Sequence, residues 1–325
     1  MDVVAVEPPL PAELIEELVT FWEAIFQTPY GDYRPALAGA EATSNHDIIY
    51  LVRAGDEVVG TSHLTTSRAV PSLGGLGEVA TKPDARGQGI ATELCARARD
   101  DFRAQGGQAL FLGTVNPAAA RVYYRLGWRK LAGANVMACI AGSDSPEAFL
   151  LDYFGDQSQA AVVGATVAER IRMIPLLVAP HDWQVLDANV GMFSTRYVVQ
   201  TSCMTLYPRY SALGQSDRGA WFGAHTALGR VVGLASARLD RASRCQVDGF
   251  THQRWSDVWD DLIQAAMRWG TSQGASVCWA AVSVEDEDKQ ALFEALGFRQ
   301  VGTDGSFDLD GRSVAAVRLE KVGHS

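Results

Sequence analysis

The residues of this sequence that are best suited to bind an anion form one short turn. They read Arg86, Gly87, Gln88, Gly89, Ile90 and Ala91. A β-prone run at 79–81 comes before the turn and ends at Pro83, which cannot donate to a sheet. Apolar residues at helical spacing follow from Ile90. A helix N-terminus offers unpaired N–H groups and a positive dipole end, and glycine lets the backbone approach a phosphate.

Two other phosphate-binding patterns are excluded by the same stretch. A Rossmann fingerprint needs a third glycine and an acidic residue after a second strand, and a P-loop needs Gly-Lys-Ser/Thr. Neither pattern is present around Gly87 and Gly89. The remaining alternative to a phosphate site is an ordinary tight turn between a strand and a helix.

A second stretch with potential chemistry lies at 116–128. Asn116 is a good N-cap, Pro117 suits the first helical position, and Gly127 suits the position after the helix end. Tyr123 falls in the middle of this predicted helix. Taken alone, Asn116 could be only a cap and Tyr123 only a core aromatic residue.

Together the two stretches resemble the GNAT acyltransferase superfamily. Arg86-x-x-Gly89-x-Ala91 is similar to the family's (Gln/Arg)-x-x-Gly-x-(Gly/Ala), and 116–128 is similar to Asn-x-x-Ala-x-x-x-Tyr-x-x-x-Gly-Phe, with Trp128 in place of Phe. The resemblance implies that residues 86–91 hold the pyrophosphate of acetyl-CoA. It implies that Asn116 bonds the pantetheine arm and that Tyr123 is the general acid beside the thioester sulfur.

The same resemblance places the strand before the turn in the cofactor site. Val79, Ala80 and Thr81 belong to this segment, and the backbone at Val79 and Thr81 is expected to bond the pantetheine and the thioester carbonyl. Fixed backbone donors stabilise a developing oxyanion with little reorganisation. No metal is expected.

Two residues are candidates for the general base. Glu78 is next to the catalytic strand segment, and its carboxylate could take a proton directly or through water. Strand alternation would turn Glu78 away from Val79 unless a bulge intervenes, so a structural role is the alternative. His63 has a suitable pKa range, with a core histidine as its alternative. The resemblance also places an acceptor pocket, suited to a cationic amine, at Glu23, Tyr30, Asp32 and Tyr33.

The second half of the chain looks like a degenerate copy of the first. Residues 221–237 mirror the hairpin around 56–60, and 276–298 mirror 109–128. Where the glycine turn should recur, residues 250–257 contain no glycine, Asp286 replaces the asparagine, and Phe293 replaces the tyrosine. Bulky side chains and a carboxylate would oppose a pyrophosphate. We therefore expect a GNAT domain at 1–142, a linker at 143–158, and a GNAT-like domain without a cofactor at 159–325.

Composition narrows the class of protein further. The 325 residues carry a net charge of −10, which argues against nucleic acid as a partner and mildly favours a cationic substrate, with plain solubility as the alternative reason for the acidic balance. The five cysteines are scattered without a Cys-x-x-Cys pair, so free thiols and a reducing cytoplasm are expected. No signal peptide or membrane span is visible.

These features predict an α/β (α+β) fold of two GNAT-like domains, each with a mixed, mostly antiparallel sheet, a splayed middle strand and flanking helices. The predicted activity is acetyl-CoA-dependent N-acetylation of a primary amine, by direct attack in a ternary complex. The alternatives are O-acylation or decarboxylation of another acyl-CoA, and a non-catalytic acetyl-CoA binding module. The predicted partner is a small-molecule amine, with the chain as a monomer (a pseudo-dimer of domains) or a homodimer.

Overall fold

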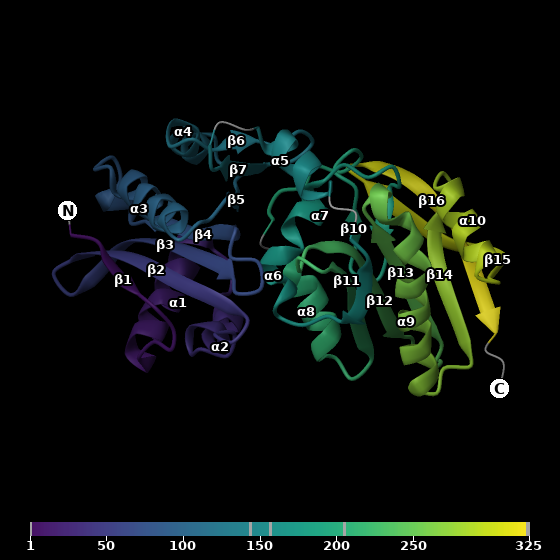
Figure 1. The fold of residues 1–325 in the computed structure, drawn as a ribbon. Helices are drawn as coiled ribbons and strands as arrows, with labels where there is room; N and C mark the ends of the chain where they lie inside the picture. Colours follow the sequence, from purple (N-terminus) through teal and green to yellow (C-terminus); the bar gives the residue numbers. More distant parts are fainter. Residues whose placement is uncertain (1, 143–144, 156–157, 204–205, 323–325) are drawn as a thin grey trace.

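The chain forms two seven-stranded sheets side by side (Figure 1). The computed structural model describes residues 2–142, 145–155, 158–203 and 206–322. The first sheet has the order β1-β2-β3-β4-β5-β7-β6, and only β4 and β5 are parallel. Its strands are β1 (Val4–Val6), β2 (Asn45–Ala54), β3 (Glu57–Ser67), β4 (Leu73–Thr81), β5 (Ala109–Gly113), β6 (Arg129–Lys130) and β7 (Val136–Ile140).

The second sheet repeats this topology. Its order, read from the β8 edge, is β8-β11-β12-β13-β14-β16-β15, and only β13 and β14 are parallel. The strands are β8 (Ala160–Gly164), β11 (Gly219–Thr226), β12 (Val231–Leu239), β13 (Cys245–Thr251), β14 (Val277–Ser283), β15 (Arg299–Leu309) and β16 (Arg312–Val322). The two mixed, mostly antiparallel sheets confirm the predicted fold class. We call β1 to β7 with their helices the first unit, and β8 onward the second unit.

Helices cover the sheets, and a short hairpin, β9 (Val185–Asp187) with β10 (Met192–Phe193), is added in the second unit. The helices of the first unit are α1 (Ala12–Phe26), η1 (Gly31–Tyr33), α2 (Arg34–Leu37), η2 (Pro83–Ala85), α3 (Ile90–Ala104) and α4 (Pro117–Arg125). Those that follow are α5 (Pro146–Tyr153), α6 (Glu169–Arg172), α7 (Ile174–Val178), α8 (Tyr207–Gln215), η3 (Gln253–Val258), α9 (Trp259–Ser272) and α10 (Glu287–Ala295). None of the helices in these described ranges has the length and apolar character needed to cross a bilayer.

Strand alternation divides the core of the first unit between two helices. On β2, Ile48 and Tyr50 pack with α3, whereas Ile49 and Leu51 pack with α1 on the other face. The strand before the glycine turn is longer than the sequence predicted, because β4 begins at Leu73. In this first part of β4, Gly74 lets the strand lie close to α3, because a Cβ at Gly74 would be 2.9 Å from the ring of Phe102.

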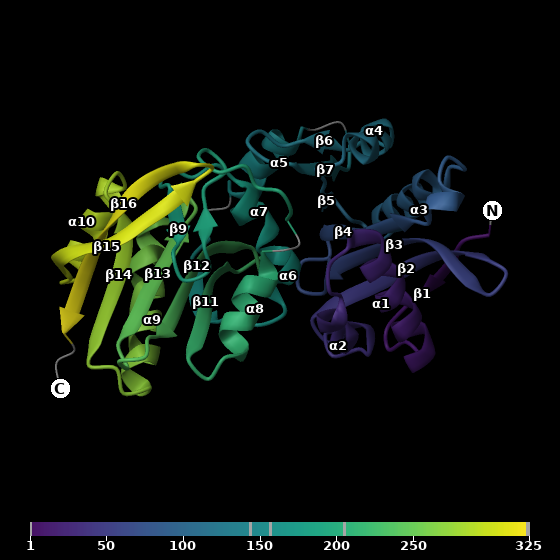
Figure 2. The same ribbon diagram turned by 180° about the vertical axis from the view of Figure 1, so that it is seen from behind.

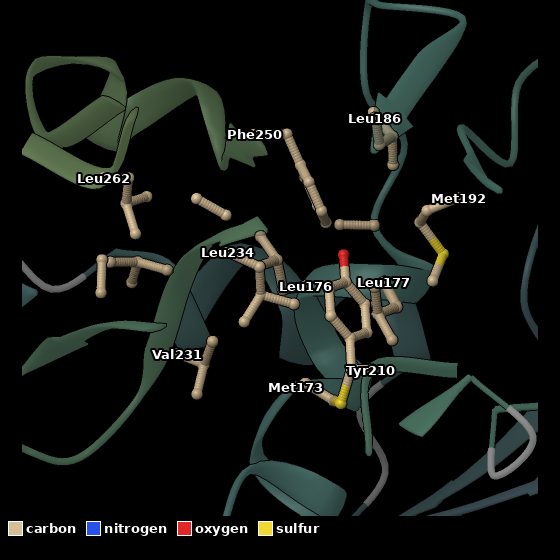
Figure 3. Close-up of a cluster of buried hydrophobic side chains, with 14 of the residues drawn as sticks. Met173, Leu176, Leu177, Leu186, Met192, Tyr210, Val231, Leu234, Phe250 and Leu262 are labelled. Atoms are coloured by element: carbon tan, nitrogen blue, oxygen red, sulfur yellow. The ribbon is translucent and has the colours of Figure 1, made fainter. Parts of the chain in front are cut away.

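One hydrophobic cluster extends through both units. Phe111 of β5 and Ala138 of β7 belong to the same buried cluster as Leu150 of α5. The cluster continues into the second unit, where Leu177 of α7 and Phe250 of β13 lie near Tyr210 of α8 (Figure 3). Within the segment predicted as a linker, residues 146–153 form α5, which packs against β7 and lies close to α7 in the reverse view (Figure 2).

Candidate active site on the first unit

A β-bulge in β4 determines where the first candidate base points. Thr61 of β3 faces Ala80, but His63 faces Gly77, so two residues of β4 oppose the single Ser62. The extra residue is Glu78, whose φ of 46° lies in the left-handed region. The sequence analysis required a bulge at this point for Glu78 to act as the base, and the bulge is present. It breaks the alternation that would turn Glu78 away from Val79.

The bulge lies where β4 separates from β5. The parallel ladder between these strands runs from Leu73↔Ala109 to Gly75↔Phe111, and Val79, Ala80 and Thr81 lie beyond its last pair. This is the splayed middle strand that the sequence predicted. In Figure 1, β5, β7 and α4 lean away from the sheet formed by β1 to β4.

The Glu78 side chain joins a buried polar network. Its carboxylate accepts a hydrogen bond from Tyr33 Oη at 3.0 Å and lies 3.2 Å from His63 Nδ1. The opposite ring nitrogen, His63 Nε2, lies 2.8 Å from Asp47 Oδ1, which also accepts from Thr65 Oγ1. We call Asp47, His63 and Glu78 the His63 network.

His63 carries a positive charge in this network. Both ring nitrogens face carboxylates, which only accept, so both must be protonated. Burial lowers the pKa of His63, but hydrogen bonds to Asp47 and Glu78 outweigh this effect and raise it to about 9. Burial alone would raise the pKa of Asp47, yet the contact with His63 holds it below its usual value. His63 is therefore neither an ordinary core histidine nor a free base, and it orients Glu78.

Aromatic rings surround the network on the α1 side. Trp22 stacks on His63 with ring centroids 6.4 Å apart, and its Nε1 donates to Thr61 Oγ1. Tyr30 and Tyr33 lie 5.2 Å apart and both contact Trp22. Burial, reinforced by Glu78, raises the pKa of Tyr33, which therefore stays a neutral donor.

The four residues predicted to build the acceptor pocket divide into two groups. Tyr33 contacts Glu78 directly, and Tyr30 lies against Tyr33. Glu23 instead accepts from the backbone N–H of Tyr30 at 3.0 Å, and Asp32 is exposed on η1. The structure thus brings the two tyrosines to the network, with Glu23 fixing one of them.

The glycine turn has the backbone expected for an anion site. Gly87 and Gly89 have φ of 80° and 83°, and a Cβ at either would meet no atom within 4 Å. Gly89 is the N-cap of α3 and supplies no side-chain cap to the first-turn N–H groups of Ile90 and Ala91. Arg86 is exposed and donates to the carbonyl of Thr81, and Gln88 is exposed beside it.

The other two predicted cofactor and acid residues lie on α4. Asn116 caps this helix, because its Oδ1 accepts from the N–H groups of Ala118 and Ala119. Tyr123 is 6% exposed and packs against Trp128. Burial raises its pKa, so its hydroxyl keeps its proton at neutral pH. Among the described residues, that hydroxyl has no hydrogen-bond partner.

In the second unit, the corresponding gap between strands is filled by the chain itself. The β13–β14 ladder covers only Cys245↔Cys278 and Gln246↔Trp279. Beyond it, Asp286 accepts from the backbone N–H groups of Gln184 and Val185 at 2.7 and 3.1 Å. Asp286 thus binds residues 184–187, which we call the β9 segment, instead of capping its own helix.

A buried ion pair holds the other side of the β9 segment. Lys289 Nζ donates to the carbonyls of Val185 and Leu186 and lies 2.6 Å from Asp248 Oδ1 on β13. The β12–β13 register also runs without a shift, so β13 has no counterpart of the Glu78 bulge.

Comparisons with known proteins agree with the geometry of the first unit. Residues 12–128 match the sequence model of the acetyltransferase (GNAT) family. A curated relative, acetyltransferase Atu2258 of Agrobacterium fabrum, is 44% identical over 46 residues, which are 14% of this chain and 34% of the relative. The match thus spans about a third of that relative's length.

Two solved structures each align with half of the chain. A GNAT-family acetyltransferase from Streptococcus pneumoniae is 14% identical with a TM-score of 0.39, covering 50% of this chain and 99% of its own. The spermidine/spermine N-acetyltransferase SpeG from Vibrio cholerae, determined with manganese ions, is 17% identical with a TM-score of 0.38, covering 50% and 92%. In the described ranges of the present chain, no group of three or more His, Cys, Asp or Glu is placed to hold a metal ion.

Two members of the site were missed by the sequence analysis. Asp47 could have been found, because the predicted hairpin pairs it with Thr65, two residues from His63. Arg170 could not, because it lies in the second unit and meets the network only through the packing of α6 on β3 and β4.

Proposed function

We propose that the first unit transfers an acetyl group from acetyl-CoA to the primary amine of a small cationic molecule, by direct attack in a ternary complex. The observation that carries the proposal is the β4 bulge. It directs the buried carboxylate of Glu78 toward Tyr33 and His63, at the point where β4 separates from β5. The match of residues 12–128 to the GNAT family supports acetyl-CoA as the co-substrate.

Each residue of the site has a part in the proposed reaction. The turn from Arg86 to Ala91 binds the pyrophosphate, and Asn116 bonds the pantetheine arm. Glu78 takes a proton from the ammonium, directly or through water, and the neutral amine attacks the thioester carbon. Backbone N–H groups at Val79 and Thr81 stabilise the oxyanion. The C–S bond then breaks, and Tyr123 gives its proton to the departing thiolate.

A cationic acceptor fits the charge around Glu78. Glu41, Asp47 and Glu78 are three carboxylates, and Arg170 with protonated His63 supplies two positive charges, so one negative charge is left. The rings of Trp22, Tyr30 and Tyr33 lie beside this charge. An ammonium group is attracted both to the carboxylate and to aromatic faces.

Thiol release from acetyl-CoA across a panel of amines tests the proposal. We expect release only with an amine present, with diamines and other cationic amines giving the lowest KM. The acetylated amine should appear by mass spectrometry in equal amount to the free thiol. Tight binding of acetyl-CoA without amine-dependent release would refute the transferase and favour a binding module. Release with alcohols instead of amines would favour O-acylation.

Only one acetyl-CoA should bind to each chain. In the second unit the β9 segment lies between β13 and α10, where it takes up the hydrogen bonds of Asp286 and Lys289. Isothermal titration calorimetry is expected to give about one bound acetyl-CoA per chain, as for a protein with a single site for its ligand. A stoichiometry near two would show that the second unit also binds the cofactor.

A further inference from the structure

Arg170, a residue of the second unit, is inserted into the polar site of the first. It lies on α6, which packs against β3 and β4 (Figures 1 and 2). Its side chain is 5% exposed. Its Nη1 lies 2.7 Å from Glu41 Oε2 and 3.9 Å from Asp47 Oδ1, and its guanidinium lies 5.7 Å from the centre of the Tyr33 ring.

A second contact fixes α6 in this position. Asn45, the first residue of β2, donates through Nδ2 to Glu41 and to the carbonyl of Val167, three residues before Arg170. Asn45 is fully buried. The contact of α6 with the first unit therefore includes partly buried hydrogen bonds from Arg170 and Asn45 to Glu41, and a buried arginine paired in this way has little freedom to leave.

Residues 201–203 of the second unit also lie close to the site of the first unit. Gly113 at the end of β5 lies so close to the chain at 201–203 that a Cβ on it would be 2.7 Å from Ser202 Cα. Cys203 is 1% exposed, and burial, with a smaller effect of Glu78, raises its pKa to about 12. The Cys203 thiol is therefore uncharged at physiological pH and lines the site as a neutral group.

We propose that Arg170 positions the His63 network, so that the acceptor site of the first unit is complete only in the presence of the second. The inference rests on the proposed function in one respect, since it assigns Glu78 the role of base. Arg170 touches neither substrate nor cofactor and acts through Asp47, which holds His63, which in turn holds Glu78.

The charge of Arg170 is the property that matters. It is one of two positive charges set among three carboxylates. The charged and titratable groups that face the network are Asp47 from β2, Glu78 from β4, Tyr30 before η1, Tyr33 from η1, Glu41 before β2, Arg170 from α6, Cys203 and, at the start of α8, Tyr207. Removing one positive charge makes the site more negative, so every acid in it holds its proton to higher pH.

The test compares Arg170→Met with Arg172→Met. Arg172 is on the same helix and equally buried, but it pairs with Glu169 and donates to Gly229, both in the second unit. The acid side of the kcat/KM profile is expected to move up by about one pH unit in Arg170→Met, as for loss of an opposite charge within about 4–6 Å. It should not move in Arg172→Met, and Arg170→Lys should restore it.

A second measurement, which does not depend on turnover, accompanies the pH profile of kcat/KM. The imidazole NMR signal of His63, identified by its loss in His63→Gln, is expected to titrate at higher pH in Arg170→Met than in wild type. Thermal unfolding and the Kd for acetyl-CoA show whether each variant is folded. If Arg170→Met does not fold, Arg170→Gln carries the same expectations.

The outcomes separate the two proposals. An unshifted His63 titration and an unshifted profile in folded Arg170→Met would overturn the role of Arg170 and leave the transferase intact. Equal shifts in Arg172→Met would overturn it as well, because they would show a general loosening of α6. Absence of amine-dependent release in wild type would refute the transferase, while the His63 titration would still decide whether Arg170 controls the network.

Discussion

Replacing Glu78 with glutamine is expected to lower kcat/KM for the amine by about 10²–10⁴ at neutral pH, the range associated with a lost general base. Glutamine has nearly the same size and can still accept from Tyr33, so the Kd for acetyl-CoA should change little. The loss should shrink as pH rises toward about 10, because more of a typical alkylamine is then already neutral. Steady-state kinetics between pH 6 and 10 measure both effects.

Glu16→Gln is the matched control for this change. Glu16 is an exposed carboxylate of α1 that pairs with Arg34, away from the network. Its removal should leave kcat/KM unchanged. A Glu78→Gln protein with wild-type kinetics across the whole pH range would show that the carboxylate is structural, and the base would then have to be sought elsewhere.

Replacing Tyr123 with phenylalanine is expected to lower kcat by at least about tenfold, as for removal of a general acid, with little change in KM for the amine. The ring keeps its packing on Trp128, so unfolding should be unaffected. The hydroxyl has no hydrogen-bond partner among the described residues, which leaves it available to the leaving thiolate. Thiol release by the two proteins at saturating substrate measures the effect.

The pH dependence of this variant separates the acid from the network. Burial raises the pKa of Tyr123, so this group should not lose its proton below pH 10. His63 has a pKa raised to about 9, and the order it gives Glu78 is present below that pH and lost above it. A fall in activity near pH 9 should therefore persist in Tyr123→Phe. A fall that disappears in this variant would assign the titration to Tyr123 instead.

The parts of the site built from consecutive residues could be predicted from the sequence. The turn at Arg86 to Ala91 and the cap at Asn116 depend on local rules, since glycine permits a positive φ and asparagine accepts from the next turn. The mixed, mostly antiparallel sheet with its splayed middle strand also followed, because the resemblance to GNAT proteins covers the first unit. The repeat extended this prediction to the second sheet.

The parts that depend on pairing between distant segments could not. The direction of the Glu78 side chain depends on one extra residue in the β3–β4 register. No local preference of Gly77 or Glu78 specifies that bulge. The charge on His63 depends on Asp47, which joins it only when β2 and β3 pair. Arg170 and the β9 segment lie in the part of the second unit for which the first offers no pattern, between β8 and β11.

The β9 segment supplies hydrogen-bond partners that a bound ligand would otherwise have to supply. A domain that stops binding its ligand is left with unpaired donors and acceptors where the ligand was, and these destabilise the fold. Here Asp286 and Lys289 are satisfied by peptide groups of the same chain. Because that peptide is tethered, it is present at a high effective concentration and does not dissociate. We therefore expect the order of this part of the second unit to be independent of how much acetyl-CoA the cell contains.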